Sequence, residues 1–294
     1  MSILIFGNCQ IGSLADSIEI LVEGSKCDRV LASNEPAILK SELHDAASAG
    51  HELVLIHDSV QNIIDINPEL QGILPASAVL IPTITFSAFQ PDIQYAFAEG
   101  RVMKNGLKSD WNSRILLWAY VNGLSHIEAR QIFCEEVYEA LGYFDEWNVS
   151  EQILESAFER CGFDYRRWMR AVQRSGAFMY GINHPVLLGL TNLGAQIAER
   201  HFGATSSRVE EINSQITDHL AHIVWPVYPE IGDRLGLDGS MNWQVGAETA
   251  NLDTFIAKCF SGWDSVDLKN LTIQLIPELT EQEASVLLDF SKGE

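Results

Sequence analysis

The most informative segment of the sequence is Ile3-Leu4-Ile5-Phe6-Gly7-Asn8-Cys9-Gln10-Ile11-Gly12-Ser13-Leu14. It is typical of a short apolar strand, a tight turn and the start of a helix. We expect Gly7 to allow the unusual backbone angles of a sharp turn and Asn8 to tolerate them. Cys9 then lies near the helix N-terminus, where N–H groups bind an oxyanion or phosphate and the helix dipole favours a thiolate. The alternative is that Cys9 is a small buried residue at a strand end.

Two familiar glycine motifs do not fit this segment. A dinucleotide-binding loop, G-x-G-x-x-G, requires glycine at the position of Cys9, and a Walker A loop requires Lys before the Ser or Thr that follows its second glycine. The turn is therefore a candidate oxyanion site, formed by Gly7, Asn8 and Gln10 around Cys9.

Outward from this segment, short β-type runs alternate with helical runs over the first hundred residues. We expect strands at residues 2–6, 27–32, 52–57 and 78–81, and helices at 10–22, 36–47 and 59–66. Such alternation predicts βαβ units, and hence a short parallel sheet with flanking helices. Ligands bind at the carboxyl ends of the strands in folds of this kind.

Beyond Pro91 the pattern becomes mainly helical. Ser125 and Glu128 match the spacing of a capping box. We expect helices at residues 111–122, 125–141, 150–161, 165–173, 185–202 and 207–224. The sequence therefore predicts an α/β protein with a sheet region at residues 1–100 and a large, mainly helical region at 101–294. Because no Gly/Ser linker separates them, we expect the two regions to pack as one compact unit.

The composition argues against several classes of protein. The 294 residues contain 19 Lys and Arg against 40 Asp and Glu, a formal net charge of −21, which repels a nucleic-acid backbone. Five Cys, an odd number without a C-x-x-C pair, argue against a disulfide framework and a zinc ribbon. The sequence shows neither a signal peptide nor an apolar run of about 18 residues. We therefore expect a soluble, cytoplasmic protein without a membrane span.

Three motifs resemble the WcbI family of capsular polysaccharide biosynthesis enzymes. They are Gly7-Asn8-Cys9-Gln10 after the first strand, Ile81-Pro82 to Phe86 leading to Pro91-Asp92, and Asn183-His184-Pro185 after Phe178-Met179-Tyr180. The resemblance covers about residues 1–205. It implies a coenzyme A-binding acetyltransferase that acts on a polysaccharide or its precursor sugar. Gln90 is a departure, because many members have a histidine before the Pro-Asp pair.

The arrangement is also similar, more distantly, to SGNH/GDSL esterases and acetyltransferases with their flavodoxin-like sheet. Cys9 falls where the nucleophilic serine of that group stands, and His184 with Pro185 falls where its His-Pro pair stands. The acidic residue is missing, because Gly181 occupies the position three before His184. The resemblance thus implies Cys9 and His184 as a catalytic pair, with Asn183 beside them, and does not support a full triad.

Further polar side chains are candidates for a supporting role. His57 and Asp58 follow the third expected strand and so lie at the ligand-binding edge, although a capping and packing role is the alternative. Asp92 lies in the family-like segment, and its alternative is a turn or helix cap. His219 and His222 are three residues apart on an expected helix but lack an identifiable further ligand, so we expect no metal site.

Arginines are concentrated in a short part of the chain that is expected to be helical. They are Arg160, Arg166, Arg167, Arg170 and Arg174. The last four follow a spacing that places several guanidinium groups on one helix face, where they are candidates for holding the phosphates of coenzyme A. Salt bridges with Glu155, Glu159 and Asp164 are the alternative. Arg101, Lys104 and Lys108 form a second, smaller basic group.

The resemblance and the local chemistry together imply an enzyme that moves an acetyl group from acetyl-CoA to a sugar hydroxyl. His184 is the expected general base. Cys9 is either a nucleophile that carries the acetyl group or a residue whose N–H lines the oxyanion site. The alternatives are a thiol esterase or deacetylase, and a non-catalytic carbohydrate-binding accessory protein.

Overall fold

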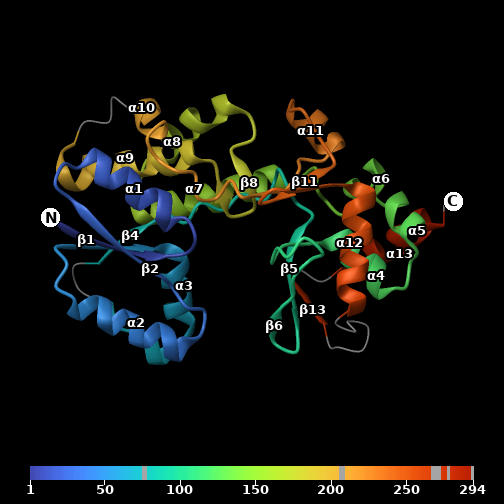
Figure 1. The fold of residues 1–294 in the computed structure, drawn as a ribbon, viewed down its shortest axis with the longest axis horizontal. Helices are drawn as coiled ribbons and strands as arrows, with labels where there is room; N and C mark the ends of the chain where they lie inside the picture. The colour runs from blue at the N-terminus through green and yellow to red at the C-terminus, as the bar shows by residue number, and fades with distance from the viewer. Residues whose placement is uncertain (75–77, 205–208, 266–272, 277–278, 293–294) are drawn as a thin grey trace. The chain divides into compact units, whose positions relative to one another are not determined.

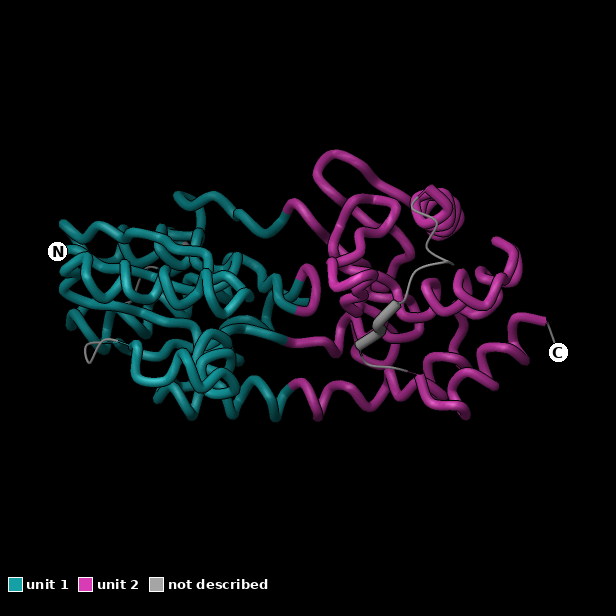
Figure 2. Tube along the Cα trace, turned by 90° about the horizontal axis from the view of Figure 1, so that it is seen from below, with its two compact units in different colours: residues 1–85, 151–179, 183–221 teal, residues 86–150, 180–182, 222–294 magenta. Residues whose placement is uncertain are grey.

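The structure is a computed structural model, shown as a ribbon in Figure 1. It describes residues 1–74, 78–204, 209–265, 273–276 and 279–292. By their internal contacts the residues divide into two compact units, coloured separately in Figure 2. Unit 1 comprises residues 1–85, 151–179 and 183–221, and unit 2 comprises residues 86–150, 180–182 and 222–294. The sequence predicts a boundary near residue 100 and one compact unit. Both stay predictions, because a division by contacts tests neither of them.

Unit 1 contains the predicted parallel sheet. Its strands are β1 (Ser2–Gly7), β2 (Lys26–Leu31), β3 (Leu53–His57) and β4 (Ala78–Ile81). They pair in the order β2-β1-β3-β4, and every pair is parallel. The register places Gly7 opposite Leu31, and His57 opposite Ile81. The predicted fold class is therefore confirmed, and the strand ends that carry Gly7 and His57 lie at one edge of the sheet.

Helices cover both faces of this sheet, as Figure 1 shows. The helical segments of unit 1 are α1 (Ile11–Leu21), α2 (Pro36–Ser48), α3 (Asp58–Ile66), η1 (Pro68–Leu70), α8 (Tyr165–Val172), η2 (Gln173–Ser175), α9 (Leu187–Phe202) and α10 (Val209–Asn213). Leu4 and Phe6 of β1 pack with Leu43 of α2 and Val60 of α3 on one face. Helices α1 and α9 pack together on the other face. Alternate side chains of a strand point to opposite faces of the sheet. Because helices cover both faces, the buried strand β1 is apolar on both of its sides.

Unit 2 combines helices with short antiparallel strands. Its helices are α4 (Arg114–Val121), α5 (His126–Gln131), α6 (Glu135–Ala140), α11 (Pro229–Leu235), α12 (Leu252–Ser265) and α13 (Glu281–Ser291). Its strands are β5 (Ile93–Ala98), β6 (Arg101–Val102), β7 (Asn112–Ser113), β10 (Ile223–Val224), β11 (Asn242–Val245), β12 (Glu248–Asn251) and β13 (Ile273–Ile276). The core is aromatic: Trp243 stacks on Phe255 with ring centroids 4.2 Å apart. The helical character expected after Pro91 is confirmed, and the antiparallel strands are an addition that the sequence analysis missed.

Two elements contain residues of both units, and a short strand of unit 1 follows them in sequence. Helix α7 (Glu146–Cys161) and strand β8 (Met179–Gly181) each contain residues of both units, and β9 (His184–Pro185) follows in unit 1. Helix α7 begins four residues before the predicted start at Ser150.

Two of the predicted helices are interrupted for local reasons. The helix expected at 111–122 begins at Arg114, because Asn112 and Ser113 pair with β5 and the Ser113 hydroxyl caps α4. The helix expected at 125–141 divides into α5 and α6, although the capping box at its start is confirmed.

The helix expected at 207–224 is mostly wrong. Helix α10 ends at Asn213, residues 223–224 form a strand, and the first two residues of the predicted range lie outside the described part. Asp218 accepts a hydrogen bond from the Leu220 N–H at 3.1 Å, and such a local bond competes with helix formation. His219 and His222 therefore do not share a helix face.

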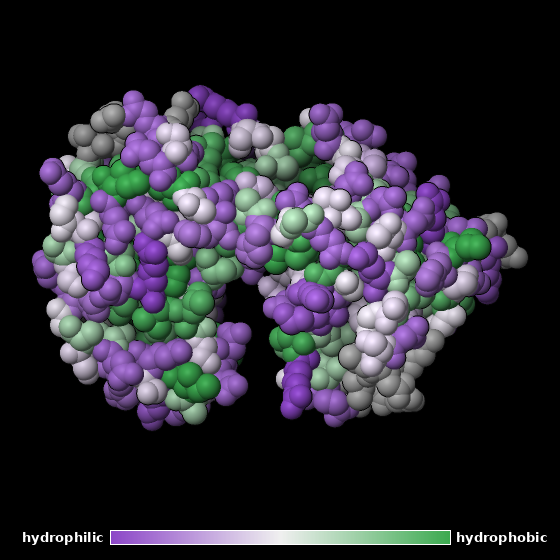
Figure 3. All heavy atoms as spheres, viewed as in Figure 1, coloured by the Kyte–Doolittle hydropathy of each residue, from purple (hydrophilic) through white to green (hydrophobic). Residues whose placement is uncertain are grey.

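Figure 3 shows one face of the molecule, on which hydrophilic residues predominate and hydrophobic residues gather in smaller groups. Within the described ranges, no helix is both long enough and apolar enough to cross a membrane. The same ranges contain no group of three His, Cys, Asp or Glu side chains arranged to hold a metal ion.

Candidate functional site

The turn that carries Cys9 connects β1 to α1 at the carboxyl edge of the sheet. The Asn8 side-chain oxygen accepts the Gln10 N–H at 3.1 Å, and the Asn8 carbonyl accepts the Ile11 N–H at 3.2 Å. Asn8 thus forms an Asx turn directly before α1, whose N-cap residue Gln10 makes no side-chain cap bond. Neither Gly7 nor Asn8 has a positive φ, so the expectation that these residues provide unusual backbone angles is wrong. The side chain of Asn8 therefore shapes the turn.

Gly7 is required for another reason, which is the close approach of His57. A Cβ atom added at Gly7 would lie 2.5 Å from both Cγ and Nδ1 of the His57 ring. No side chain fits in that space unless the ring moves. Gly7 and His57 are 50 positions apart in sequence but lie on neighbouring strands, β1 and β3.

Cys9 is the exposed cysteine of the five. Although the residue is exposed, the surrounding protein desolvates its thiol and raises its pKa to about 11, against a smaller opposing effect of its own backbone N–H. This direction is opposite to the thiolate expected at a helix N-terminus, because desolvation of the charged form outweighs the backbone hydrogen bond. The ordinary state of Cys9 at neutral pH is the thiol.

Gln10 connects the Cys9 turn to two distant segments. Its buried side-chain amide donates to the Ile84 carbonyl at 2.8 Å and to the Asn183 carbonyl at 3.0 Å, and its oxygen accepts the Ile84 N–H at 3.1 Å. Ile84 follows β4, and Asn183 precedes β9. One side chain therefore joins the parts of the three family-like motifs that lie in unit 1, so Gln10 acts as a clamp in addition to its place in the turn.

His184 lies in the segment that Gln10 holds. It begins β9 with 7% of its surface exposed, and Val186 donates to the Phe178 carbonyl at 2.9 Å across this turn. Helix α9 begins at Leu187, two residues after the predicted start. Because Gln10 follows Cys9 directly and Asn183 precedes His184 directly, the Cys9 turn and the His184 segment are neighbours in unit 1.

Asp58 is buried next to His57 and is strongly bound. Its carboxylate forms an ion pair with Arg160 and accepts the Thr83 N–H at 2.8 Å. The Thr83 hydroxyl in turn donates to Ser59 at 2.9 Å. Asp58 therefore anchors the loop after β4 to the end of β3. The sequence analysis missed Thr83, although it lies inside the Ile81 to Phe86 stretch.

Asp92 belongs to unit 2 and is fully buried there. Its carboxylate accepts hydrogen bonds from the Ile115 N–H at 3.0 Å, the Tyr143 hydroxyl at 2.9 Å and the Tyr228 hydroxyl at 2.6 Å. Desolvation raises its pKa, although these bonds oppose the shift. The structure gives Asp92 the capping role that the sequence analysis named as the alternative, and a part in catalysis stays a prediction.

Helix α8 separates an apolar face from an arginine face. Asp164 caps its start, and Tyr165, Trp168, Met169 and Val172 are buried. Arg167 binds Glu199 at 2.8 Å, and Arg160 binds Asp58, so both are ion-paired, but with carboxylates other than the expected Glu155, Glu159 and Asp164. Arg166, Arg170 and Arg174, which we call the arginine stripe, are exposed and form no ion pair with any described residue.

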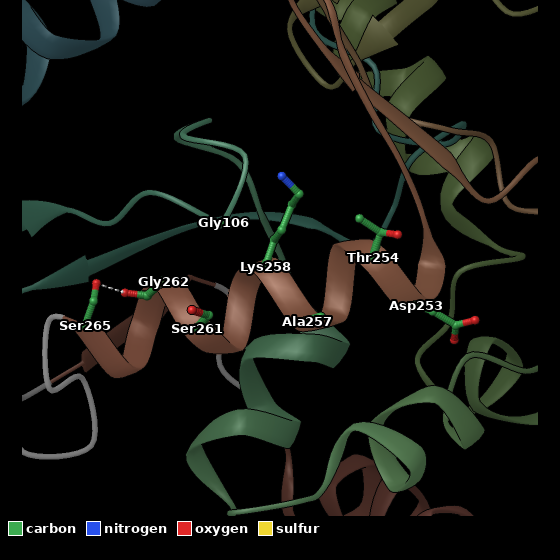
Figure 4. A pocket seen from close by; sticks show the side chains of 8 residues that line it. All are labelled: Gly106, Asp253, Thr254, Ala257, Lys258, Ser261, Gly262 and Ser265. Carbon is green, nitrogen blue, oxygen red and sulfur yellow. Dashed lines mark hydrogen bonds between the residues drawn. The ribbon is translucent and has the colours of Figure 1, made fainter.

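Unit 2 has an open groove beside α12, shown in Figure 4. Thr254, Lys258 and Ser261 of α12 line it together with Gly106. Lys258 forms an ion pair with Glu248, so its charge is neutralised. None of the site residues predicted from the sequence lines this groove, and it has no polar side chain that points to a particular chemistry.

Comparison with curated proteins and with solved structures gave no match. Comparison with protein families gave a match over residues 2–205 to the family described as polysaccharide biosynthesis enzyme WcbI. This range contains the Cys9 turn, the His184 segment and the arginine stripe, and it confirms the resemblance seen in the three motifs. The chain belongs to the WcbI family of polysaccharide biosynthesis enzymes.

Proposed function

We propose that this protein transfers an acetyl group from acetyl-CoA to a sugar hydroxyl during polysaccharide biosynthesis, and that it does so in the cytoplasm. The observation that carries the proposal is the Gln10 side chain, which bonds the Cys9 turn to Asn183 beside His184. A thiol and an imidazole are thereby held on neighbouring segments at the ligand-binding edge of a parallel sheet. Family membership supplies the role in polysaccharide biosynthesis.

His184 acts as the general base of this reaction. It takes the proton of the sugar hydroxyl as the oxygen attacks the acetyl carbonyl carbon, and the carbon–sulfur bond to coenzyme A then breaks. The proton passes to the departing thiolate, so the products are the acetylated sugar and free coenzyme A. The Cys9 N–H stabilises the oxyanion that forms between the two steps, because the N–H groups of Asn8 and Gln10 already donate to His57 and to the Asn8 side chain.

The raised pKa of Cys9 limits how this residue can act. With a pKa of about 11, only about one thiol in 10⁴ is ionised at pH 7. A nucleophilic Cys9 therefore requires His184 to remove its proton in the same step, after which the acetyl group passes from Cys9 to the sugar. In the other route the sugar hydroxyl attacks directly, and Cys9 contributes only its N–H.

The arginine stripe is the part of unit 1 best suited to the phosphates of coenzyme A. Its three guanidinium groups follow one another at four-residue spacing and have no carboxylate partner among the described residues, in a chain with a net charge of −21. Guanidinium groups bind phosphate oxygens through paired hydrogen bonds. Arg167 contributes less, because its fork is occupied by Glu199.

Calorimetric titration with coenzyme A, followed by an assay of acetyl transfer to a panel of nucleotide sugars and oligosaccharides, tests the proposal. We expect binding, and release of free coenzyme A that depends on the sugar. His184→Asn should lower the rate about 10²-fold or more while binding survives, and the loss of rate of the wild type at acid pH should disappear. His44→Asn, an exposed histidine of α2, is the matched control.

Cys9→Ala and Cys9→Ser separate the two routes. Loss of transfer in both variants indicates a nucleophilic thiol, and a nearly unchanged rate in both indicates direct attack. Hydrolysis of acetyl sugars without coenzyme A binding would replace the proposal with the esterase. Sugar binding without any reaction, unaffected by the substitutions at Cys9 and His184, would indicate the accessory protein.

A further inference from the structure

His57 has an unusual environment for a polar side chain. It is fully buried at the end of β3, and its ring fills the space beside Gly7 into which a Cβ atom would project. The ring therefore packs against the backbone at Gly7, where the Cys9 turn begins. The neighbouring Asp58 carboxylate is already engaged by Arg160 and Thr83.

The contact with Asn8 determines the tautomer of the ring. The Asn8 N–H donates to Nδ1 of His57 at 3.4 Å, so Nδ1 is the acceptor and carries no proton. In a neutral imidazole the proton is then on Nε2. A doubly protonated ring would place two N–H donors against each other. Desolvation acts in the same direction and lowers the pKa of His57 to about 4, against a smaller opposing effect of Asp58.

The other ring nitrogen is not used by the fold. Nε2 of His57 is buried and has no hydrogen-bond partner among the described residues. The contribution of His57 to the fold therefore comes from the shape of the ring and from Nδ1. The ring acts on Gly7 and Nδ1 acts on Asn8, the two residues directly before Cys9.

We propose that His57 is a positioning residue, which holds the Gly7–Cys9 turn in place as a neutral imidazole through ring packing on Gly7 and the Nδ1 contact with Asn8. The proposal rests on the proposed function in taking Cys9 as the working residue of the site and His184 as its base. It divides the roles of the two histidines: His184 moves the proton, and His57 sets the position of the thiol and of the turn's N–H groups.

Substitutions that keep one ring nitrogen at a time test the assignment. In His57→Asn the side-chain oxygen takes the place of Nδ1, whereas in His57→Gln the amide takes the place of Nε2. The measurement is the rate at which iodoacetamide labels Cys9 across a range of pH, followed by mass spectrometry. Both variants lose the ring packing on Gly7, so we expect the Asn variant to label closer to the wild-type rate than the Gln variant. The Gln variant should differ from the wild type by about fivefold or more, the equivalent of one lost hydrogen bond.

The reverse result, with the Gln variant unchanged and the Asn variant altered, would overturn the proposal and assign the function to Nε2. Equal rates in both variants and the wild type would also overturn it. His44→Asn again serves as the control. Labelling of Cys9 does not require acetyl-CoA, so a failed acetyltransferase assay and a failed labelling result are separate outcomes.

A second measurement covers the case in which a His57 variant folds poorly. Gly7→Ala should lower the melting temperature strongly in the wild type, because the new methyl group meets the ring at 2.5 Å. In a His57→Ala background the same methyl group enters the space left by the ring, so the decrease should be much smaller. An equal decrease in both backgrounds would show that ring packing does not hold the turn.

Discussion

His57 in unit 1 and Asp92 in unit 2 are both fully buried, yet their polar atoms are bonded to different extents. Both carboxylate oxygens of Asp92 accept hydrogen bonds, from a backbone N–H and two tyrosine hydroxyls. His57 has a single long contact on one nitrogen and no partner on the other among the described residues. Buried polar groups are normally satisfied, so the two residues demand different explanations.

Asp92 stabilises the core of unit 2, whereas His57 shapes the candidate site in unit 1. Asp92 ties the start of α4 to Tyr143 and Tyr228 and thereby unites separate parts of unit 2. His57 instead supports the turn that carries Cys9 and the clamp residue Gln10. From the sequence, both residues are candidates for a supporting role at the site. Only their hydrogen bonds in the folded protein distinguish them.

The largest effect that the comparison predicts is on the stability of unit 2. Asp92→Ala leaves the Ile115 N–H and two tyrosine hydroxyls without their acceptor, at about 1–3 kcal/mol each, so we expect a loss of at least about 3 kcal/mol. Urea unfolding followed by tryptophan fluorescence measures it, because Trp168 alone of the seven tryptophans lies in unit 1. Asp92→Asn keeps one acceptor oxygen and should lose less. A loss below about 1 kcal/mol in the Ala variant would remove the contrast with His57.

A second effect of comparable size is the pH dependence that His57 gives to the free energy of unfolding. Because the folded state lowers its pKa from 6.5 to about 4, the unfolded chain binds more protons between these values. The stabilisation is fully present above pH 6.5 and is lost as the pH falls towards 4, by about 3 kcal/mol. Urea unfolding of the wild type and of His57→Asn over this range should differ by that amount. If the unfolding free energies of the two proteins change in parallel with pH, the ring is not held neutral. Asp58 and Arg160, the charged groups beside it, are the same in both proteins.

A smaller effect distinguishes the basic groups of the two units. Arg170→Gln with Arg174→Gln should weaken coenzyme A binding by at least about 1.5 kcal/mol, the lower end for hydrogen bonds to charged groups. Arg101→Gln with Lys108→Gln removes the same charge from unit 2 and should change binding by less than about 0.5 kcal/mol. Calorimetry in low and high salt measures both, and high salt should weaken wild-type binding. The opposite ranking would move the phosphate site to unit 2.

The smallest effect is a ranking of the cysteines. Cys9 is exposed with a pKa of about 11, whereas burial raises the pKa of Cys27, Cys161 and Cys259 to about 12. With limiting iodoacetamide we expect Cys9 to be labelled first, because its residue is exposed and its pKa is raised less than those of the three buried cysteines. Cys134 is half-buried and is the critical comparison. Faster labelling of Cys134 or Cys259 would show that the Cys9 turn shields its thiol more than the structure indicates.

Much of unit 1 could be predicted from the sequence, because the relevant signals are local. The apolar run before Gly7 predicts β1, and the alternation over residues 1–100 predicts a parallel sheet. In unit 2, Ser125 with Glu128 likewise predicts a helix start. The placement of Cys9 and His184 at candidate site turns also follows from short motifs. Periodicity and capping act over a few residues, so a single sequence carries them in full.

The tertiary structure decided what depends on distant partners. Gly7 is glycine because of His57, Gln10 bonds to Ile84 and Asn183, and Arg160 is neutralised by Asp58. The thiol of Cys9 is desolvated by surroundings that its own segment does not supply. These partners lie up to 173 positions away in the chain. Local pattern determines which elements form, but packing between elements determines which polar atoms are paired, desolvated or left to act, and that follows only from the folded arrangement.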